Sequence, residues 1–262
     1  MNNTNTRCMK IVEYKDALKN AITPFMINIE GVDGTGKQTV AGELSSMLTR
    51  YGIDNTVISF PVYESKTGAL IKDILHNWYN NIKTKDIDID TMCMMMAIDK
   101  RLFYQDNKEL FEKTNSVIIC DRSYMSNFFY QGVDVPHTML NEFMQFLKRI
   151  EIDNTPIEGI CETGAVSTYY LYHNSISTNQ KFMRERKALD QNESDLKQLS
   201  KINTFANMYE TYIDRLNPDE VDISSYVPFK YGAISCSSGG VIASPYTIAS
   251  EILYKETHKY SL

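Results

Sequence analysis

The segment at residues 27–39, INIEGVDGTGKQT, places a short apolar run directly before a glycine-rich turn, and helical sequence follows. In such a turn, backbone N–H groups converge on phosphate oxygens at the amino terminus of the helix. Gly31, Gly34 and Gly36 provide the permissive backbone, and Lys37 provides a point charge for the β- and γ-phosphates. The segment therefore predicts a P-loop, although a glycine-rich turn between a strand and a helix is common and need bind nothing.

The end of this segment departs from the usual P-loop pattern, which finishes in Gly-Lys-Ser/Thr. Gln38 stands where the hydroxyl residue normally contacts Mg²⁺, and Thr39 follows it. The amide oxygen of Gln38, the hydroxyl of Thr39 or an intervening water could each take that place. The residues expected to bind the triphosphate are Gly31, Gly34, Thr35, Gly36, Lys37, Gln38 and Thr39.

The rest of the chain alternates between short apolar runs and longer stretches with helical spacing. This alternation predicts an α/β fold with a mostly parallel sheet. We expect one domain over residues 25–262, preceded by an N-terminal extension, residues 1–24, that starts with a disordered tail at 1–8. The expected strands are 25–30, 55–60, 116–120, 166–172 and 231–236, and the expected helices are 10–21, 37–51, 67–78 and 91–111.

Charge, cysteine spacing and hydrophobicity indicate which partners and which cell compartment to expect. The net charge of −6 provides no global basic field, so we expect binding neither to nucleic acid nor to membranes. The five cysteines lack any CxxC spacing, which indicates reduced thiols. No apolar run approaches the roughly 20 residues that a membrane-spanning helix needs, and residues 1–7 lack a signal-peptide pattern. These features favour the cytoplasm.

Four further motifs accompany the glycine-rich turn. They are FPVYESKTG (Phe60–Gly68), AIDK (Ala97–Lys100), DRSYMSNFFYQG (Asp121–Gly132) and MRERKALDQNESD (Met183–Asp195). Together with EGVDGTGKQT, they resemble the thymidylate kinase family, over about residues 25–252 with gaps and most weakly at 134–168.

The resemblance implies a fold, an activity and an assembly. The fold is a P-loop NTPase-type three-layer sandwich, with a mostly parallel five-stranded sheet, flanking helices and a helical lid at about 181–197. The activity is ATP-dependent phosphorylation of a deoxynucleoside monophosphate, with dTMP as the expected acceptor and with ATP and Mg²⁺ as cofactors. The implied assembly is a homodimer formed through helices.

The resemblance also assigns roles near the phosphates. Asp33 faces the acceptor nucleotide, Arg122 grips the acceptor phosphate, and Asp121 lies near the metal. The planar fork of an arginine suits bidentate contact with phosphate. The competing interpretations are an Asx-turn for Asp33 and a structural ion pair at a strand end for Asp121 and Arg122.

The acceptor nucleoside is assigned to a second set of residues. Asn127 reads the thymine edge and Tyr130 crowds the ribose 2′ position, although a surface amide and a core tyrosine are the alternatives. Two positions depart from the family pattern: Met96 stands where a stacking Phe is expected, and Lys100 where an Arg is expected. Phe103 or Arg101 could compensate. The complete expected set is Asp33, Phe60, Tyr63, Met96, Lys100, Arg122, Ser126, Asn127 and Tyr130.

A basic segment near residue 184 is the expected source of positive charge for the transferring phosphoryl group. Arg184 and Arg186 are the candidate lid residues, although the nearby acids also suit a solvated helix face. Two rival functions stay open at this point. A deoxynucleoside kinase shares the P-loop and a similar Asp-Arg-Ser segment, and a non-catalytic nucleotide-binding paralogue would explain Gln38.

Overall fold

A computed structural model describes residues 2–80, 88–173, 201–202, 204, 230–238 and 241–259. Its centre is a five-stranded sheet in the order β2-β3-β1-β4-β5, and every neighbouring pair is parallel. The strands are β1 (Phe25–Gly31), β2 (Asp54–Ser59), β3 (Ser116–Asp121), β4 (Val166–Tyr172) and β5 (Lys230–Ser235). The predicted five-stranded α/β fold is confirmed.

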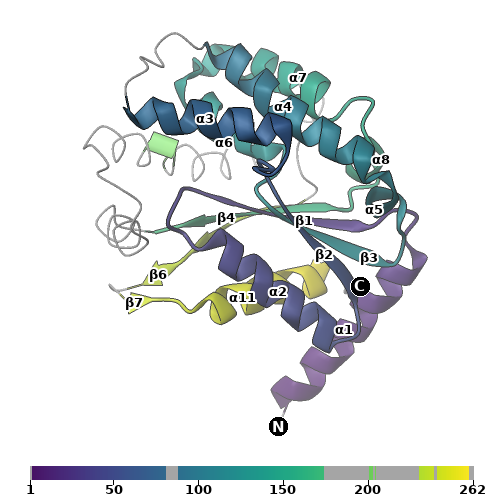
Figure 1. Cartoon of the computed structure of the whole chain (residues 1–262). Helices are drawn as coiled ribbons and strands as arrows, with labels where there is room; N and C mark the ends of the chain where they lie inside the picture. Colours follow the sequence, from purple (N-terminus) through teal and green to yellow (C-terminus); the bar gives the residue numbers. More distant parts are fainter. Residues whose placement is uncertain are drawn as a thin grey trace.

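Helices cover both faces of the sheet, which gives three layers (Figure 1). One face carries α3 (Lys66–Asn80), α4 (Ile89–Asp106), α6 (Met125–Gln131) and α7 (Leu140–Glu151), and the other carries α2 (Lys37–Arg50) and α11 (Pro245–Lys259). The short helices α5 (Lys108–Glu112) and α8 (Glu158–Glu162) lie in the connections. A separate antiparallel pair, β6 (Ser237–Ser238) and β7 (Val241–Ile242), precedes α11.

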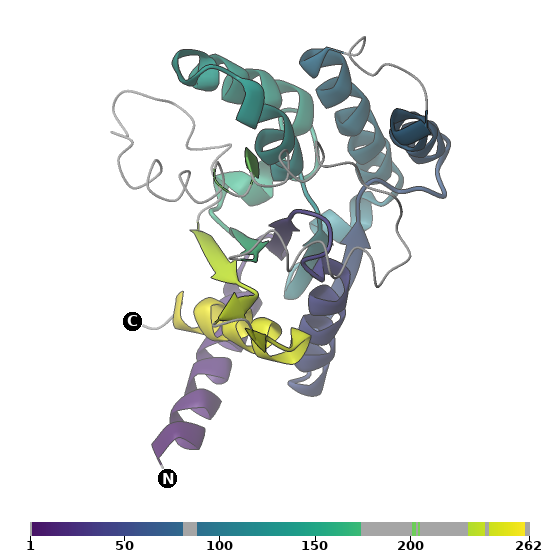
Figure 2. The same ribbon diagram turned by 90° about the vertical axis from the view of Figure 1, so that its left-hand side faces the viewer.

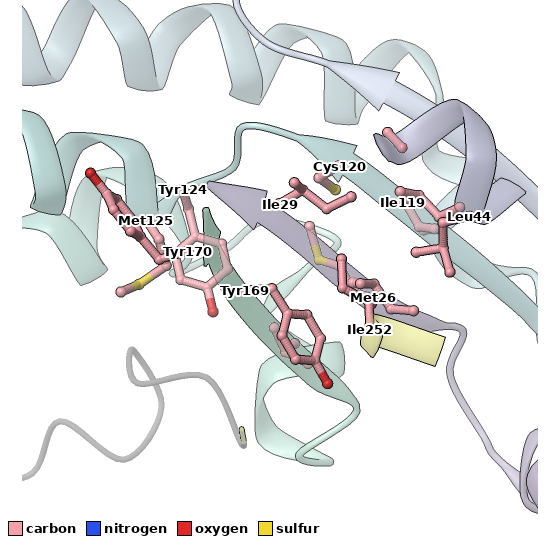
Figure 3. Close-up of a cluster of buried hydrophobic side chains, with 14 of the residues drawn as sticks. Met26, Ile29, Leu44, Ile119, Cys120, Tyr124, Met125, Tyr169, Tyr170 and Ile252 are labelled. Carbon is pink, nitrogen blue, oxygen red and sulfur yellow. The ribbon is translucent and has the colours of Figure 1, made fainter. Parts of the chain in front are cut away.

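The central strands are buried along their whole length. Every residue of β1 and β3 is buried, as expected for a parallel sheet covered on both faces. Figure 3 shows part of this core, with Met26, Ile29, Leu44, Ile119, Cys120, Tyr124, Met125, Tyr169, Tyr170 and Ile252 drawn as sticks. The core fixes the strands in register, so that the loops after β1, β3 and β4 emerge at one edge of the sheet.

The N-terminal helix α1 (Asn2–Asn20) is longer than the sequence predicted. The prediction of a disordered tail at 1–8 was therefore wrong over residues 2–8, which belong to this helix. Tyr14 and Leu18 are buried in the main core, where the Tyr14 ring meets Phe25 edge-on at 5.7 Å. Figure 2 shows the helix extending from beside α11, which it contacts. Helix propagation from an anchored segment is cooperative, so the helix can extend through its polar first turns.

A second difference concerns the helix predicted over residues 91–111. It is divided at Asn107, which joins α4 to α5. The Asn107 side chain donates to the Phe103 carbonyl at 2.9 Å, and this contact competes with continuation of the helix. None of the helices in the described ranges combines the length and the apolar character needed to cross a membrane.

Candidate active site

The loop between β1 and α2 has the backbone of a phosphate cradle. Gly31 has φ 142°, and a Cβ there would lie 2.4 Å from the Leu171 carbonyl oxygen, so only glycine fits. Gly36 adopts the left-handed conformation at φ 82° immediately before α2. The first N–H groups of a helix lack intrahelical partners. The loop therefore aims a helix amino terminus at the edge of the sheet where the other site residues lie.

Lys37 lies at the base of this cradle. Its side chain is buried, and Nζ donates to the Val32 carbonyl at 3.1 Å and lies 3.9 Å from Asp33 Oδ1. Burial lowers the pKa of Lys37 to about 8, and the nearby Arg122 charge acts in the same direction. Thr35 is also buried and donates to Val32 O at 2.9 Å, which braces the loop.

Arg122 reaches the cradle from the turn after β3. Its guanidinium forms an ion pair with Asp33 through Nη2, and its Nη1 donates to the Tyr130 hydroxyl at 2.9 Å. The backbone of Arg122 has φ 69°, and its N–H donates to Ile29 O at 3.0 Å. A non-glycine residue rarely adopts this conformation, so surrounding contacts hold it there. The structure thus brings Asp33, Arg122 and Tyr130 together.

Glu30 is a site residue that the sequence analysis did not single out. The side chain is fully buried, and Oε1 accepts from the Ser123 N–H at 2.7 Å and the Ser123 hydroxyl at 2.8 Å. Oε2 accepts from the Ser126 hydroxyl at 2.7 Å, so this hydroxyl, predicted to contact the acceptor, is bonded to Glu30 here. Burial raises the pKa of Glu30. An acid in a mostly apolar strand was the available signal.

Asp121 ends β3 beside the cradle and is 8% exposed. The Ser59 hydroxyl approaches Oδ2 at 3.4 Å, whereas the buried Oδ1 has no hydrogen-bond partner among the described residues. An unpaired carboxylate oxygen suits a hard cation, and Mg²⁺ commonly uses one or two carboxylates together with substrate phosphates. Gln38 and Thr39 are both exposed at the start of α2. The carboxylate of Asp121 and the side-chain oxygens of Gln38 and Thr39 are of the kind that Mg²⁺ binds, so the donor chemistry fits this ion.

The loop after β2 is fastened to α4 by Asp99, another residue to which the sequence analysis gave no role. This buried carboxylate accepts from Val62 N at 2.8 Å, from the Ser65 hydroxyl at 2.9 Å and from the Thr67 hydroxyl at 2.7 Å. Tyr63, predicted to contact the acceptor, lies in this loop and is 42% exposed.

Phe60, at the start of the same loop, is largely enclosed. It is 4% exposed, and its ring meets Phe103 edge-on at 5.3 Å and Tyr104 at 5.7 Å. Phe103 and Tyr104 thus both pack against the Phe60 ring. Phe103, a candidate to compensate for Met96, therefore packs on Phe60, while Met96 itself is half-buried on α4.

Lys100 and Asn127 meet a partner that the sequence did not reveal. Lys100 Nζ donates to Glu151 Oε1 at 2.8 Å, and Asn127 Nδ2 donates to the same oxygen at 2.5 Å. Burial raises the pKa of Glu151, while the Lys100 ammonium opposes that shift. Arg101, the other candidate to compensate, donates instead to the carbonyls of Ile150 and Asp153 at 3.2 Å and 3.1 Å.

His173, directly after β4, is a further residue that the sequence analysis missed. Its Nε2 lies 3.4 Å from the Gly34 carbonyl in the cradle, and burial lowers its pKa. A histidine after an apolar strand run was the available signal. The predicted lid residues Arg184 and Arg186, like the whole lid at 181–197, fall outside the described residues.

Comparison with known proteins found similarity to thymidylate kinases by family model, by sequence and by structure. The family described as thymidylate kinase matches residues 29–149. Thymidylate kinase from Mycobacterium tuberculosis (strain ATCC 25618 / H37Rv) is 26% identical over 128 residues, which are 48% of this chain and 58% of that protein. The probable thymidylate kinase of Methanobrevibacter smithii is 31% identical over 105 residues, which are 40% of this chain and 50% of that protein. The matched region thus spans only about half the length of these relatives.

Two solved structures extend the likeness in fold over most of the chain. Thymidylate kinase from Candida albicans superposes with a TM-score of 0.55 at 16% identity, covering 91% of this chain and 93% of that one. The enzyme from Ehrlichia chaffeensis gives a TM-score of 0.52 at 15% identity, covering 88% and 98%. The resemblance to the thymidylate kinase family is therefore confirmed over residues 29–149, and the likeness in fold extends over most of the chain.

Proposed function

We propose that the protein is an ATP-dependent nucleoside monophosphate kinase that converts dTMP to dTDP. The observation that carries the proposal is the placement of Arg122 against the cradle, where it pairs with Asp33 while Lys37 lies at the cradle base. A cradle with a helix amino terminus suits a triphosphate, and an arginine fork beside it suits a second phosphate. Two phosphate sites facing each other are what transfer between nucleotides requires.

Each residue then has a defined task in phosphoryl transfer. Gly31, Gly34, Thr35 and Gly36 hold the β- and γ-phosphates of ATP through the backbone, and Lys37 places its charge on the same oxygens. Arg122 and Asp33 orient the acceptor so that its phosphate oxygen attacks the γ-phosphorus in line. The reaction needs positioning and charge neutralisation rather than a protein nucleophile.

Asp121 holds the metal in this proposal, together with Gln38 or Thr39. Bound Mg²⁺ supplies neutralisation of the charge on the phosphate oxygens. Arg184 and Arg186 are proposed to bring further positive charge from the lid.

The acceptor nucleoside is proposed to lie between α4, α6 and the loop after β2. Tyr63 and Met96 are partly exposed there and provide apolar surface. Phe60 is buried at the start of the loop and anchors it to the core. Lys100 and Asn127 provide polar contacts to the base, and Tyr130 restricts the ribose. Ser126 acts through Glu30, because its hydroxyl is already bonded to that carboxylate.

A homodimer is proposed from the resemblance, and one surface of α4 supports it. Met94, Ile98 and Leu102 recur every four residues, so they share one face of the helix. They are 42%, 49% and 44% exposed, which makes an apolar stripe on the surface. The assembly proposed here covers this stripe with its copy on a second chain. Sedimentation of the wild type beside Ile98→Glu tests it, because the variant should shift to monomer.

The proposed unit is a single catalytic domain over residues 25–262 with α1 packed upon it, acting in the cytoplasm on small-molecule nucleotides. Cys93, Cys120, Cys161 and Cys236 form no disulfide among the described residues, which is consistent with a reducing compartment.

The test is a panel of acceptors with ATP and Mg²⁺, followed by ADP release. The panel contains dTMP, dUMP, dCMP and thymidine. The proposal predicts turnover with dTMP and none above background with thymidine, because thymidine carries no phosphate for Arg122. Turnover of thymidine instead of dTMP would establish a nucleoside kinase. ATP binding without turnover of any acceptor would establish a non-catalytic binder.

A further inference from the structure

Three polar side chains from three helices meet in the layer above the sheet. Lys100 comes from α4, Asn127 from α6 and Glu151 from the last residue of α7. Both donors reach the same oxygen, Glu151 Oε1, and Asn127 Nδ2 also donates to Cys93 O at 3.0 Å. The exposed fractions of the three residues are 3%, 2% and 0%, so solvent screens this cluster little.

A buried cluster of this kind is not expected to stabilise the core more than apolar side chains would. Glu151 Oε2 is buried and has no hydrogen-bond partner among the described residues, although a carboxylate accepts up to four bonds. A buried ion pair is often no more stabilising than apolar side chains of the same volume. Stability alone therefore does not account for a carboxylate held this way between two donors.

Two members of the cluster are sequence neighbours of residues that hold the surroundings of the proposed acceptor site in place. Asp99, next to Lys100, fastens the loop that carries Tyr63. Ser126, next to Asn127, is bonded to Glu30 at the end of β1. The cluster thus connects the two helices that flank the proposed nucleoside pocket.

We propose that Glu151 is a positioning residue of the acceptor-base pocket, which holds the Lys100 ammonium and the Asn127 amide in one orientation and thereby sets the preference for thymine over cytosine. The inference rests on the proposed function, because the nucleoside pocket is part of it.

The chemistry of the two bases gives the direction of the preference. A lysine ammonium is a donor only, with three N–H groups, of which Glu151 fixes one direction. In this proposal the Lys100 ammonium faces the 4-position of the base, where a fixed donor favours the carbonyl of thymine and disfavours the amino group of cytosine, which is also a donor. A lysine without its carboxylate partner is free to change rotamer and loses this discrimination.

The test compares the wild type with Glu151→Gln, which keeps the shape and an acceptor oxygen but removes the charge. The expected result is a dTMP KM and Kd raised about tenfold, as for one lost charge-assisted hydrogen bond, with kcat and the ATP KM changed less than about twofold. The ratio of dTMP to dCMP affinity should fall by a similar factor. Glu142→Gln, on the exposed face of the same helix, is the matched control and should change neither value.

A second variant and a direct measurement of nucleotide binding complete the test. Glu151→Asp retains the charge on a shorter side chain and should give an intermediate shift, which shows that charge and reach both matter. Affinities for dTMP and dCMP are measured by calorimetry as well as by turnover. Absence of dTMP turnover in the wild type overturns the proposed function, whereas an unchanged dTMP/dCMP affinity ratio in folded Glu151→Gln overturns the role of Glu151.

Discussion

The side chains of Asp33 and Arg122 form an ion pair that joins the loop after β1 to the turn after β3, across 89 positions of sequence. Arg122 is mostly buried, whereas the Asp33 side chain is 56% exposed. The pair therefore places a guanidinium at the rim of the cradle, with its carboxylate partner on the solvent side. In the proposed function, an incoming acceptor phosphate competes with Asp33 for the guanidinium donors of Arg122.

Arg122→Lys should disable acceptor binding while it leaves ATP binding intact. Lysine lacks the fork that contacts Asp33 and Tyr130 at once, so it cannot hold a phosphate bidentately. We expect kcat/KM for dTMP to fall about 10²-fold or more, and the Kd for ATP to change less than threefold. Arg149→Lys, an exposed position on α7, is the control. An equal loss for both substrates would contradict the assignment.

The pH dependence of ATP use should report Lys37. Burial lowers the pKa of this ammonium to about 8, so the free protein carries the charge below that pH and loses it above. Because the triphosphate is attracted to the protonated form, kcat/KM for ATP should fall above pH 8 by about tenfold per unit. Lys37→Arg keeps its charge over this range, and its residual activity should lack that decline. A decline that persists in Lys37→Arg would assign it to another group.

Asp121→Asn should weaken the use of magnesium specifically. The substitution removes the negative charge of the carboxylate, whose Oδ1 has no partner among the described residues, while it keeps one side-chain oxygen in place. We expect the Mg²⁺ concentration for half-maximal activity to rise about tenfold, with part of the maximum rate recovered at high Mg²⁺. The readout is a Mg²⁺ titration at fixed ATP, with Asp90→Asn at an exposed position as the control. Identical titration curves for the wild type and Asp121→Asn would refute the metal role.

Leu18→Ala should destabilise the whole domain although it lies in the N-terminal extension. Leu18 is 1% exposed and belongs to the same core cluster as the strands. Truncation of a buried leucine typically costs about 2–5 kcal/mol in the free energy of unfolding. Val12→Ala, on the same helix at 55% exposure, should cost less than about 0.5 kcal/mol. Urea denaturation of both variants measures these free energies of unfolding. Equally small effects would show that α1 does not contribute to the stability of the domain.

The sequence predicted the fold where local patterns decide the structure. The apolar runs around Ile27 and Ile119 became the fully buried strands β1 and β3, and the glycine pattern at Gly31–Gly36 became the cradle. The strand predicted over residues 166–172 matches β4 for the same reason. These elements are determined by residues close in sequence.

The contacts that organise the site could not be predicted in the same way, because they join distant residues. Glu151 meets Lys100 across 51 positions, and Glu30 meets Ser123 across 93. No spacing rule links such pairs, and an acid on a helix usually faces solvent. The polar first turns of α1 were misjudged for a related reason, since Tyr14 and Leu18 are anchored by partners elsewhere in the chain.

In the proposed function, the cradle and Arg122 hold a triphosphate and a nucleoside monophosphate at the same time. The most direct measurement is the chromatographic identification of dTDP from ATP, Mg²⁺ and dTMP, for the wild type and for Lys37→Ala. We expect dTDP and ADP in equal amounts from the wild type, and a rate lower by about 10³-fold for the variant. No dTDP from the wild type, or near-normal dTDP formation by Lys37→Ala, would contradict it.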